Sequence, residues 1–299
     1  MVHDRLERHS TADGDHITLA RMGTARPGVP HLLVLHGLEG SLRAKYAHGL
    51  LARARTLGWS GDLLLFRSCD GLENSAPRLY HSGETTDLDS VVRRLRQDAP
   101  ETPLFICGVS LGGNVLLKWL GERGEEAAGL VRRAAAVSVP FDLAAGSRHL
   151  ERGFSRVYAT HFLRTLKPKA LTKAARFPGI IDPEAIRRAR TFREFDDAAT
   201  APLHGFRNAA EYYMRSSSIG FLQAIRVPTL LMSAIDDPFV RNDVLNAVST
   251  IAAESAWLRA EFTPRGGHVG WVEGSILPSG YYMEAFVVDD LSNGITVTV

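Results

Sequence analysis

The chain has 299 residues, of which 45% are hydrophobic and 23% charged, and its formal net charge of +2 is too small to predict a nucleic-acid partner. Two cysteines, Cys69 and Cys107, exclude a disulfide framework and lack the spacing of metal ligands. No apolar run approaches the roughly 20 residues of a membrane-spanning helix, and the polar N-terminus lacks the apolar segment of a signal peptide, so we expect a cytoplasmic protein.

Short apolar runs and helical repeats alternate along the chain. Residues 16–22 alternate between polar and apolar side chains and are predicted to form an antiparallel edge strand. Runs typical of buried strands follow, with the last of them the weakest, at 31–37, 62–66, 103–108, 134–139, 228–234 and 257–263. Apolar residues recur at helical spacing in 44–57, which ends at Gly58, and in 86–97, which Thr85 and Thr86 precede as candidate caps. This order predicts an α/β fold with a mostly parallel twisted sheet and helices on both faces.

The alternation fails between about 141 and 225. This region is rich in Arg, Phe and Tyr and contains no clear strand, so we interpret it as a helical cap inserted into a single α/β domain that spans 1–299. Its aromatic residues are expected mostly to pack the cap onto the sheet, with one or two lining an apolar acyl pocket. They are Phe154, Tyr158, Phe162, Phe195, Phe206, Tyr212, Tyr213 and Phe221.

A Gly-x-Ser-x-Gly motif, GVSLG at 108–112, lies between a strand-like and a helix-like segment. A nucleophile on such a sharp turn takes strained backbone angles, and glycines two residues either side of it avoid collisions. The motif therefore predicts Ser110 as a nucleophile at the start of a helix, where the N–H of Leu111 faces a developing oxyanion. The alternative is a turn that only needs small residues.

A second oxyanion donor is predicted in HGLEG at 36–40, directly after the first strong strand. Its two glycines let the backbone curl towards the reaction centre, so that the N–H of Leu38 faces that of Leu111. We interpret His36 as a structural residue of this loop, and a plain glycine-rich turn is the alternative.

The remaining members of a serine triad are expected near the C-terminus. Asp236 and Asp237 end an apolar run and precede a proline, so one of them is the candidate acid, with Asp237 preferred and helix capping as the alternative. His268 follows the glycine pair of PRGGHVGW and is the candidate base. The resulting chain order Ser, Asp, His is that of the α/β-hydrolases.

Together, several segments between about 30 and 275 resemble the YheT-like branch of the α/β-hydrolase fold. The segments are HGLEGS (36–41), RLYHSG (78–83), GVSLGGN (108–114), SVPFDL (138–143), EFDDAATAPLHGF (194–206), EYYMRSSS (211–218), AIDDPF (234–239) and GGHVGW (266–271). That family includes bacterial carboxylesterase-like proteins, eukaryotic abhydrolase-domain lipases and phospholipases, and yeast acyltransferases that make medium-chain ethyl esters. The resemblance implies Ser110 as nucleophile, Asp237 as acid and His268 as base.

The resemblance also implies a role for RLYHSG in shaping the pocket mouth, with His81 as a structural rather than a catalytic residue. One departure is Ser68, where the family leads us to expect glycine, which affects only local loop geometry. The tail after about 275 matches no known pattern, and its TVTV end argues against a helix that covers the sheet edge.

These observations predict a serine hydrolase that cleaves short- to medium-chain acyl esters or lipids through an acyl-enzyme, with no metal or organic cofactor. An acyltransferase that passes the acyl group to an alcohol needs the same triad, so it stays open. A non-catalytic binding protein predicts a broken triad, and metal-dependent hydrolysis predicts an HExxH or clustered-ligand signature that this sequence lacks. The physiological ester and the oligomeric state are left open.

Overall fold

A mixed eight-stranded sheet forms the centre of the molecule, with strand order β1-β2-β4-β3-β5-β6-β7-β8. The computed structural model describes residues 2–153, 155–273 and 280–293. The strands are β1 (Arg5–Ser10), β2 (His16–Met22), β3 (His31–Leu35), β4 (Ser60–Leu65), β5 (Leu104–Val109), β6 (Arg133–Val137), β7 (Thr229–Ala234) and β8 (Leu258–Thr263). From β4 to β8 every neighbouring pair is parallel, whereas β1–β2 and β2–β4 are antiparallel. The prediction of a mostly parallel sheet is therefore confirmed.

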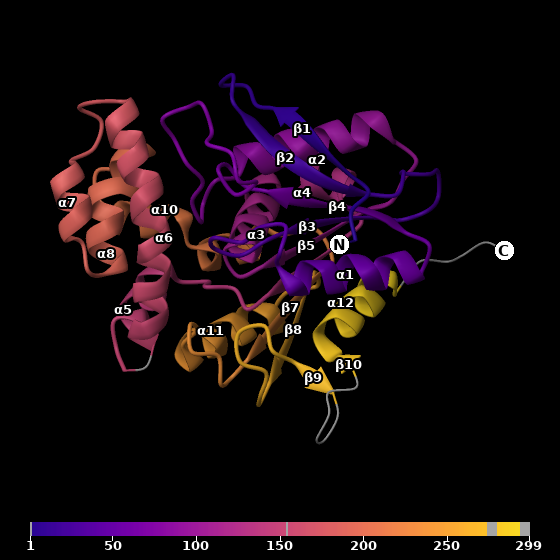
Figure 1. The fold of residues 1–299 in the computed structure, drawn as a ribbon. Coiled ribbons are helices and arrows are strands. Elements are labelled where there is room, and N and C mark those ends of the chain that lie inside the picture. The colour runs from indigo at the N-terminus through magenta and orange to yellow at the C-terminus, as the bar shows by residue number, and fades with distance from the viewer. Residues whose placement is uncertain (1, 154, 274–279, 294–299) are drawn as a thin grey trace.

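Helices cover both faces of this sheet, as predicted (Figure 1). They are α1 (Lys45–Thr56), α2 (Thr86–Asp98), α3 (Leu111–Arg123), α4 (Glu125–Leu130), α11 (Asn242–Ala253) and α12 (Tyr282–Ser292). One apolar cluster joins the sheet to α2, α3 and α11, and a second joins the opposite face to α1 and α12. Central strands are buried on both faces, which is why they read as unbroken apolar runs.

The edge of the sheet corrects one prediction. The strand β2 is antiparallel as expected, but it is not the edge, because β1 pairs along its outer side from Arg5–Arg21 to Ser10–His16. The sequence of β1, RLERHS, is largely exposed and charged, which suits a strand that must not pair with other chains but gives little hydrophobic signal.

The residues predicted at the helix ends are confirmed at α1 and only in part at α2. Gly58 follows α1 with a positive φ of 76°, as its predicted role at the helix end requires. Thr85 occupies the N-cap position of α2, as predicted, but neither Thr85 nor Thr86 caps through its side chain. Instead the Glu84 carboxylate accepts the N–H of Thr86 at 2.7 Å and that of Asp87 at 3.3 Å. A glutamate two residues before a helix performs the same electrostatic task as a capping hydroxyl.

The segment interpreted as a cap contains helices and connecting turns but no strand in its described part, which excludes residue 154. Its elements are α5 (Leu143–Leu150), α6 (Ser155–Arg176), α7 (Pro183–Arg188), α8 (Phe192–Phe195), the π-helical turn η1 (Asp196–Thr200), α9 (Ala201–Leu203), α10 (Ala209–Ser216) and the 3₁₀ segment η2 (Ser218–Ala224). In Figure 1 the helices α5 to α8 gather at one end of the molecule, beside the sheet. A separate apolar cluster holds α6, α7, α8 and η1 together, whereas η2 packs against α3.

The C-terminal tail corrects another expectation. A helix, α12, does cover the sheet, and it lies beside α1 with Met283, Val287 and Leu291 buried (Figure 1). Two short strands, β9 (Val272–Glu273) and β10 (Gly280–Tyr281), pair just before it. The TVTV end of the chain lies outside the described residues. Within the described ranges, no helix is long and apolar enough to cross a bilayer.

Candidate active site

Ser110 lies on a sharp turn between β5 and α3, with φ 55° and ψ −121°. This left-handed backbone is strained for a residue with a side chain. The flanking glycines are required by space: a Cβ on Gly108 would lie 2.5 Å from the carbonyl oxygen of Gly112, and one on Gly112 would lie 2.6 Å from the carbonyl oxygens of Leu35 and His36. The Ser110 amide donates to Val137 O at 2.8 Å, which fixes the turn to the neighbouring strand β6.

The two amides predicted as oxyanion donors belong to segments that meet at this turn. Gly37 packs so closely on Ser110 that a Cβ there would lie 3.1 Å from Ser110 Cβ. Leu38 follows it, Leu111 begins α3, and both line the same cavity as Ser110. Neither the Leu38 nor the Leu111 amide donates a hydrogen bond to another residue in the described part of the chain.

His36 holds this loop, as predicted. Its Nδ1–H donates to Gly37 O at 2.7 Å, and its Nε2 accepts the N–H of Phe66 at 3.2 Å, so the ring is used in its neutral form. Burial lowers the pKa of His36 to about 4, which keeps the ring neutral.

His268 and Asp237 are in direct contact. His268 Nδ1 lies 2.8 Å from Asp237 Oδ2, and the buried carboxylate also accepts the N–H of Phe239 at 2.8 Å. The ring of Phe239 packs edge-on against the imidazole with centroids 4.4 Å apart. Of the two candidate aspartates, Asp237 therefore reaches the histidine.

Asp236 and Ser138 hold the loop that carries His268. Asp236 Oδ1 accepts the N–H of Gly267 at 2.8 Å, and the Ser138 hydroxyl donates to the His268 carbonyl oxygen. Ser138 follows β6 with a positive φ of 53° and is fully buried. Sequence reasoning missed both roles, although a polar residue directly after a buried strand was a usable signal for Ser138.

Ser110 and His268 line one cavity, whose empty volume is about 1140 Å³ counted out to its open mouth. The Ser110 hydroxyl makes no hydrogen bond to His268 or to any other residue in the described ranges. Catalytic hydrogen bonds often form or shorten only when substrate binds. The structure therefore brings all five predicted site residues to one cavity or its immediate wall, since Asp237 lies directly behind His268.

The walls of the cavity are mainly apolar and come largely from the segment at 141–225. More cap aromatics line it than the one or two expected: Phe162, Phe195, Tyr212 and Tyr213 do, and Phe192 joins them. Tyr158 packs instead on Phe239, and Phe221 lies beneath Lys118, while Phe154 lies outside the described residues. Some of these aromatic residues therefore line the cavity, and others pack against neighbouring side chains.

A polar group interrupts the apolar wall. Asp196 in η1 accepts hydrogen bonds from Thr200 Oγ1 at 2.6 Å and from the Tyr213 hydroxyl at 2.7 Å. Burial raises the pKa of Asp196 to about 6. His81 packs against His204 with ring centroids 4.4 Å apart and the ring planes tilted by 60°, and burial lowers the pKa of both rings. His81 Nδ1 accepts the N–H of Gly83, which agrees with the structural role expected for His81.

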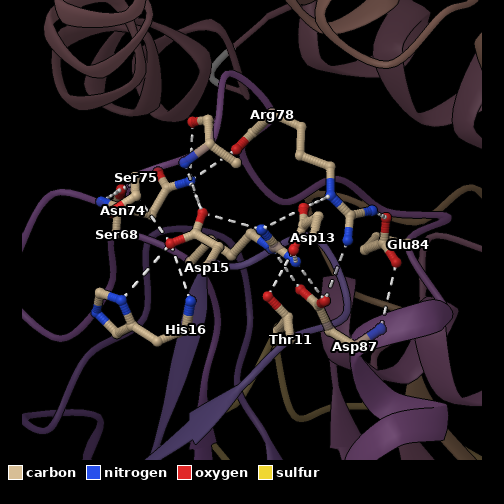
Figure 2. A network of polar contacts seen from close by, with 12 residues as sticks. Thr11, Asp13, Asp15, His16, Ser68, Asn74, Ser75, Arg78, Glu84 and Asp87 are labelled. Carbon is tan, nitrogen blue, oxygen red and sulfur yellow. Dashed lines mark hydrogen bonds and ion pairs between the residues drawn. The ribbon is translucent and has the colours of Figure 1, made fainter.

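The loop at 68–84, whose residues Leu79 to Ser82 line the cavity, is anchored by a buried ionic network around Arg67. Figure 2 labels its carboxylate partners Asp13, Asp15 and Asp87. The fully buried guanidinium of Arg67 donates to both oxygens of Asp87 at 2.7 Å. It also donates to Asp13 and Asp15 in the β1–β2 turn. Such paired, fully hydrogen-bonded charges hold a fixed geometry.

Asp15 connects this network to the loop and to the cap. It accepts hydrogen bonds from the Asn74 side chain and from the amides of Ser75 and Ala76, as Figure 2 shows for the labelled residues. Burial alone would raise the pKa of Asp15, but these bonds lower it to about 2. On the cap side, the buried Lys173 of α6 donates to the carbonyl oxygens of Asn74 and Ala76.

Ser68 and Arg78 complete the anchoring of the loop. Ser68 has a positive φ of 58°, which explains the expectation of glycine there, and its hydroxyl bonds Asn74. Arg78 donates to Asp13 at 2.7 Å and to Glu84 at 2.9 Å (Figure 2). The segment that brings Leu79 to Ser82 to the cavity is therefore held by side-chain contacts on both sides.

The cysteines and the other potential ligands do not add to the site. Cys69 and Cys107 are buried free thiols, and burial raises the pKa of each to about 12. Within the part of the chain that the structure describes, no three His, Cys, Asp or Glu side chains cluster as a metal site would require.

Comparison with known proteins gives consistent results. A family model described as serine aminopeptidase, S33, matches residues 81–268. The chain is 39% identical over 290 residues to the esterase-type protein YheT of Escherichia coli (strain K12), with 96% of this chain and 84% of that protein covered. It is 31% identical to the monoacylglycerol lipase of Saccharomyces cerevisiae, over 81% of this chain and 55% of that protein.

The solved structure of alpha/beta hydrolase domain-containing protein 10 from mouse shares the fold. It superposes with a TM-score of 0.59 at 14% identity and covers 96% of this chain and 98% of that chain. At that identity the likeness concerns the fold alone.

Proposed function

Because the chain belongs to the serine aminopeptidase S33 family of α/β-hydrolases, within which it groups with YheT-like esterases, we propose that it is a serine hydrolase of carboxylic esters. The observation that carries the proposal is the contact of His268 with the buried carboxylate of Asp237, in the cavity whose floor holds Ser110 on its strained turn. We assign Ser110 as nucleophile, His268 as base and Asp237 as the acid that orients it.

The geometry suits acyl-enzyme chemistry. The Nδ1–H of His268 donates to Asp237, so Nε2 is left as the acceptor for the Ser110 proton. Ser110 Oγ attacks the ester carbonyl, whose oxygen becomes negative and accepts hydrogen bonds from the Leu38 and Leu111 amides. The protonated His268 then gives its proton to the leaving alcohol. Water repeats the sequence on the acyl-enzyme and releases the acid.

The cap sets the substrate class. Aromatic and aliphatic side chains from the segment at 141–225 enclose the cavity over Ser110, so we propose that this segment is the cap of a single domain. Burying an alkyl chain against such walls contributes about 0.8 kcal/mol for each methylene group. The cavity therefore favours short- to medium-chain acyl esters or lipids.

The test is hydrolysis of p-nitrophenyl esters with acyl chains from two to sixteen carbons, by wild type and by Ser110→Ala. We expect wild type to act on a bounded range of chain lengths and Ser110→Ala to lose roughly three or more powers of ten in kcat. Added ethanol distinguishes hydrolysis from transfer, because a transferase forms the ethyl ester at the expense of the acid. Equal activity of wild type and Ser110→Ala would remove Ser110 from the mechanism and with it the proposed function.

A further inference from the structure

Glu39, the residue after the Leu38 oxyanion donor, is fastened at both its backbone and its side chain. Its N–H donates to the Tyr80 hydroxyl at 2.8 Å, and the same hydroxyl donates to Glu39 Oε1 at 2.8 Å. Glu39 has a positive φ of 56°, a conformation that costs energy for a residue with a Cβ. The Tyr80 hydroxyl thus accepts one bond from Glu39 and donates another to it, which holds that strained backbone and with it the direction of the adjacent Leu38 amide.

A lysine from the cap completes this cluster. Lys169 of α6 donates from Nζ to Glu39 Oε1 at 2.8 Å, and the same ammonium lies 5.9 Å from the centre of the Tyr80 ring. Both members of the pair are largely shielded, with 27% of the Lys169 side chain and 11% of the Glu39 side chain exposed. The third neighbour of the ammonium is the Cys69 thiol, 3.8 Å away.

The position of Glu39 makes this pair relevant to catalysis. A carboxylate one residue from an oxyanion donor repels the negative charge that develops on the substrate oxygen, and little water is present to screen it. An ammonium on the same carboxylate oxygen cancels that repulsion. The Cys69 thiol does not compete as a charge, because burial raises its pKa to about 12.

We propose that Lys169 is a positioning residue of the oxyanion hole: it neutralises Glu39 and, through Glu39, fixes the Leu38 amide. The cap helix α6 thereby contributes to transition-state stabilisation as well as to the acyl pocket. This inference rests on the proposed function, since it takes Leu38 as an oxyanion donor.

The test measures kcat and KM for p-nitrophenyl butyrate in a double-mutant cycle of Lys169→Met and Glu39→Gln. In the wild-type background Lys169→Met leaves the Glu39 carboxylate without its ammonium partner. We expect kcat to fall about ten- to a hundredfold with KM nearly unchanged, which is less than the effect of removing a whole oxyanion donor. In the Glu39→Gln background no carboxylate remains, so the same change should cost less than about threefold. Lys169→Arg keeps the charge and should retain most of the activity.

The matched control is Lys167→Met on the same helix, because within the described residues Lys167 donates to Arg187 O alone and does not line the cavity. It should leave kcat and KM unchanged. If Lys169→Met destabilises the fold, Lys169→Gln gives the neutral side chain with a polar end and the same expectation.

Two results would overturn the inference. Equal losses of kcat in both backgrounds would make Lys169 a simple cap anchor, and a change confined to KM would make it a pocket wall. Failure of the proposed function is recognised separately, since it shows as undiminished activity of Ser110→Ala, whatever Lys169→Met does.

Discussion

Exchanging Asp237 for asparagine should inactivate the enzyme, whereas the same exchange at the adjacent Asp236 should not. The buried Asp237 carboxylate accepts from the Phe239 amide through Oδ1 and from His268 Nδ1 through Oδ2. An asparagine whose oxygen keeps the Phe239 bond turns its NH₂ group towards His268. Nδ1 must then accept instead of donate, the ring proton moves to Nε2, and the imidazole can no longer take the proton of Ser110.

The size of the effect follows from that change of tautomer. Loss of the correct tautomer with the geometry intact lowers kcat about 10⁴-fold, which corresponds to roughly 5 kcal/mol of transition-state stabilisation. Asp236 is exposed, and among the described residues its side chain accepts a bond from the Gly267 amide alone, at 2.8 Å. An asparagine oxygen accepts that bond equally well. We therefore expect Asp236→Asn to keep kcat within about threefold of wild type, the scale of a lost surface charge.

The assay is steady-state hydrolysis of one p-nitrophenyl ester by wild type, Asp237→Asn and Asp236→Asn, with circular dichroism melting to show that each is folded. The neighbouring substitution controls for any general effect of removing a charge from this loop. Comparable losses in the two variants, or an Asp237→Asn enzyme within tenfold of wild type, would refute the assignment of Asp237 as the orienting acid.

Two further predictions concern the cap. Burial raises the pKa of Asp196 to about 6, above the value of about 3.8 for an exposed carboxyl, so the folded state loses stability as the pH rises through this window. Asp196→Asn should therefore stabilise the protein at pH 8, by up to about 3 kcal/mol, and not at pH 4; a difference in Tm that is the same at both pH values would contradict this. Lys173→Met removes the hydrogen bonds to the carbonyl oxygens of Asn74 and Ala76, so the free energy of unfolding should fall by about 2 kcal/mol. Urea titration measures this change. An unchanged midpoint would show that the stability of the protein does not depend on these two bonds.

The parts of the fold that the sequence predicted are those with a local hydrophobic signal. Every central strand is buried on both faces and was recognised as an apolar run, and helices α1 and α2 were recognised from their spacing. The edge strand β1 was missed because its charged, exposed residues carry no such signal. The helix α12 was missed for another reason: its buried face includes Glu284 and Asp290 among the apolar residues, so the apolar periodicity is weak.

The residues of the candidate site are of two kinds. Some belong to turn motifs that the sequence reveals, and others hold those turns in place. Ser110, Leu38 and His268 each belong to a glycine-containing loop at the end of a strand, and glycine marks such loops because a Cβ would collide there. For the triad acid, the sequence left two adjacent candidates, Asp236 and Asp237. Which of the two faces His268 depends on how the chain turns after β7, and the turn itself gives no residue-type signal.

The supporting residues could not be found because their partners lie far away along the chain. The hydroxyl of Ser138 meets the His268 carbonyl across 130 residues, Lys169 meets Glu39 across the same separation, and Tyr80 meets Glu39 across 41. Serine, lysine and tyrosine are common residues, and a contact between segments far apart in the chain leaves no motif in the sequence around them. Each of them nevertheless fixes a loop that carries a proposed catalytic group, and the cap supplies one of the three. The strained turns are thus marked by local sequence, whereas the contacts that hold them form only when distant segments pack together. Substitutions at the supporting positions should therefore change kcat by displacing the catalytic groups.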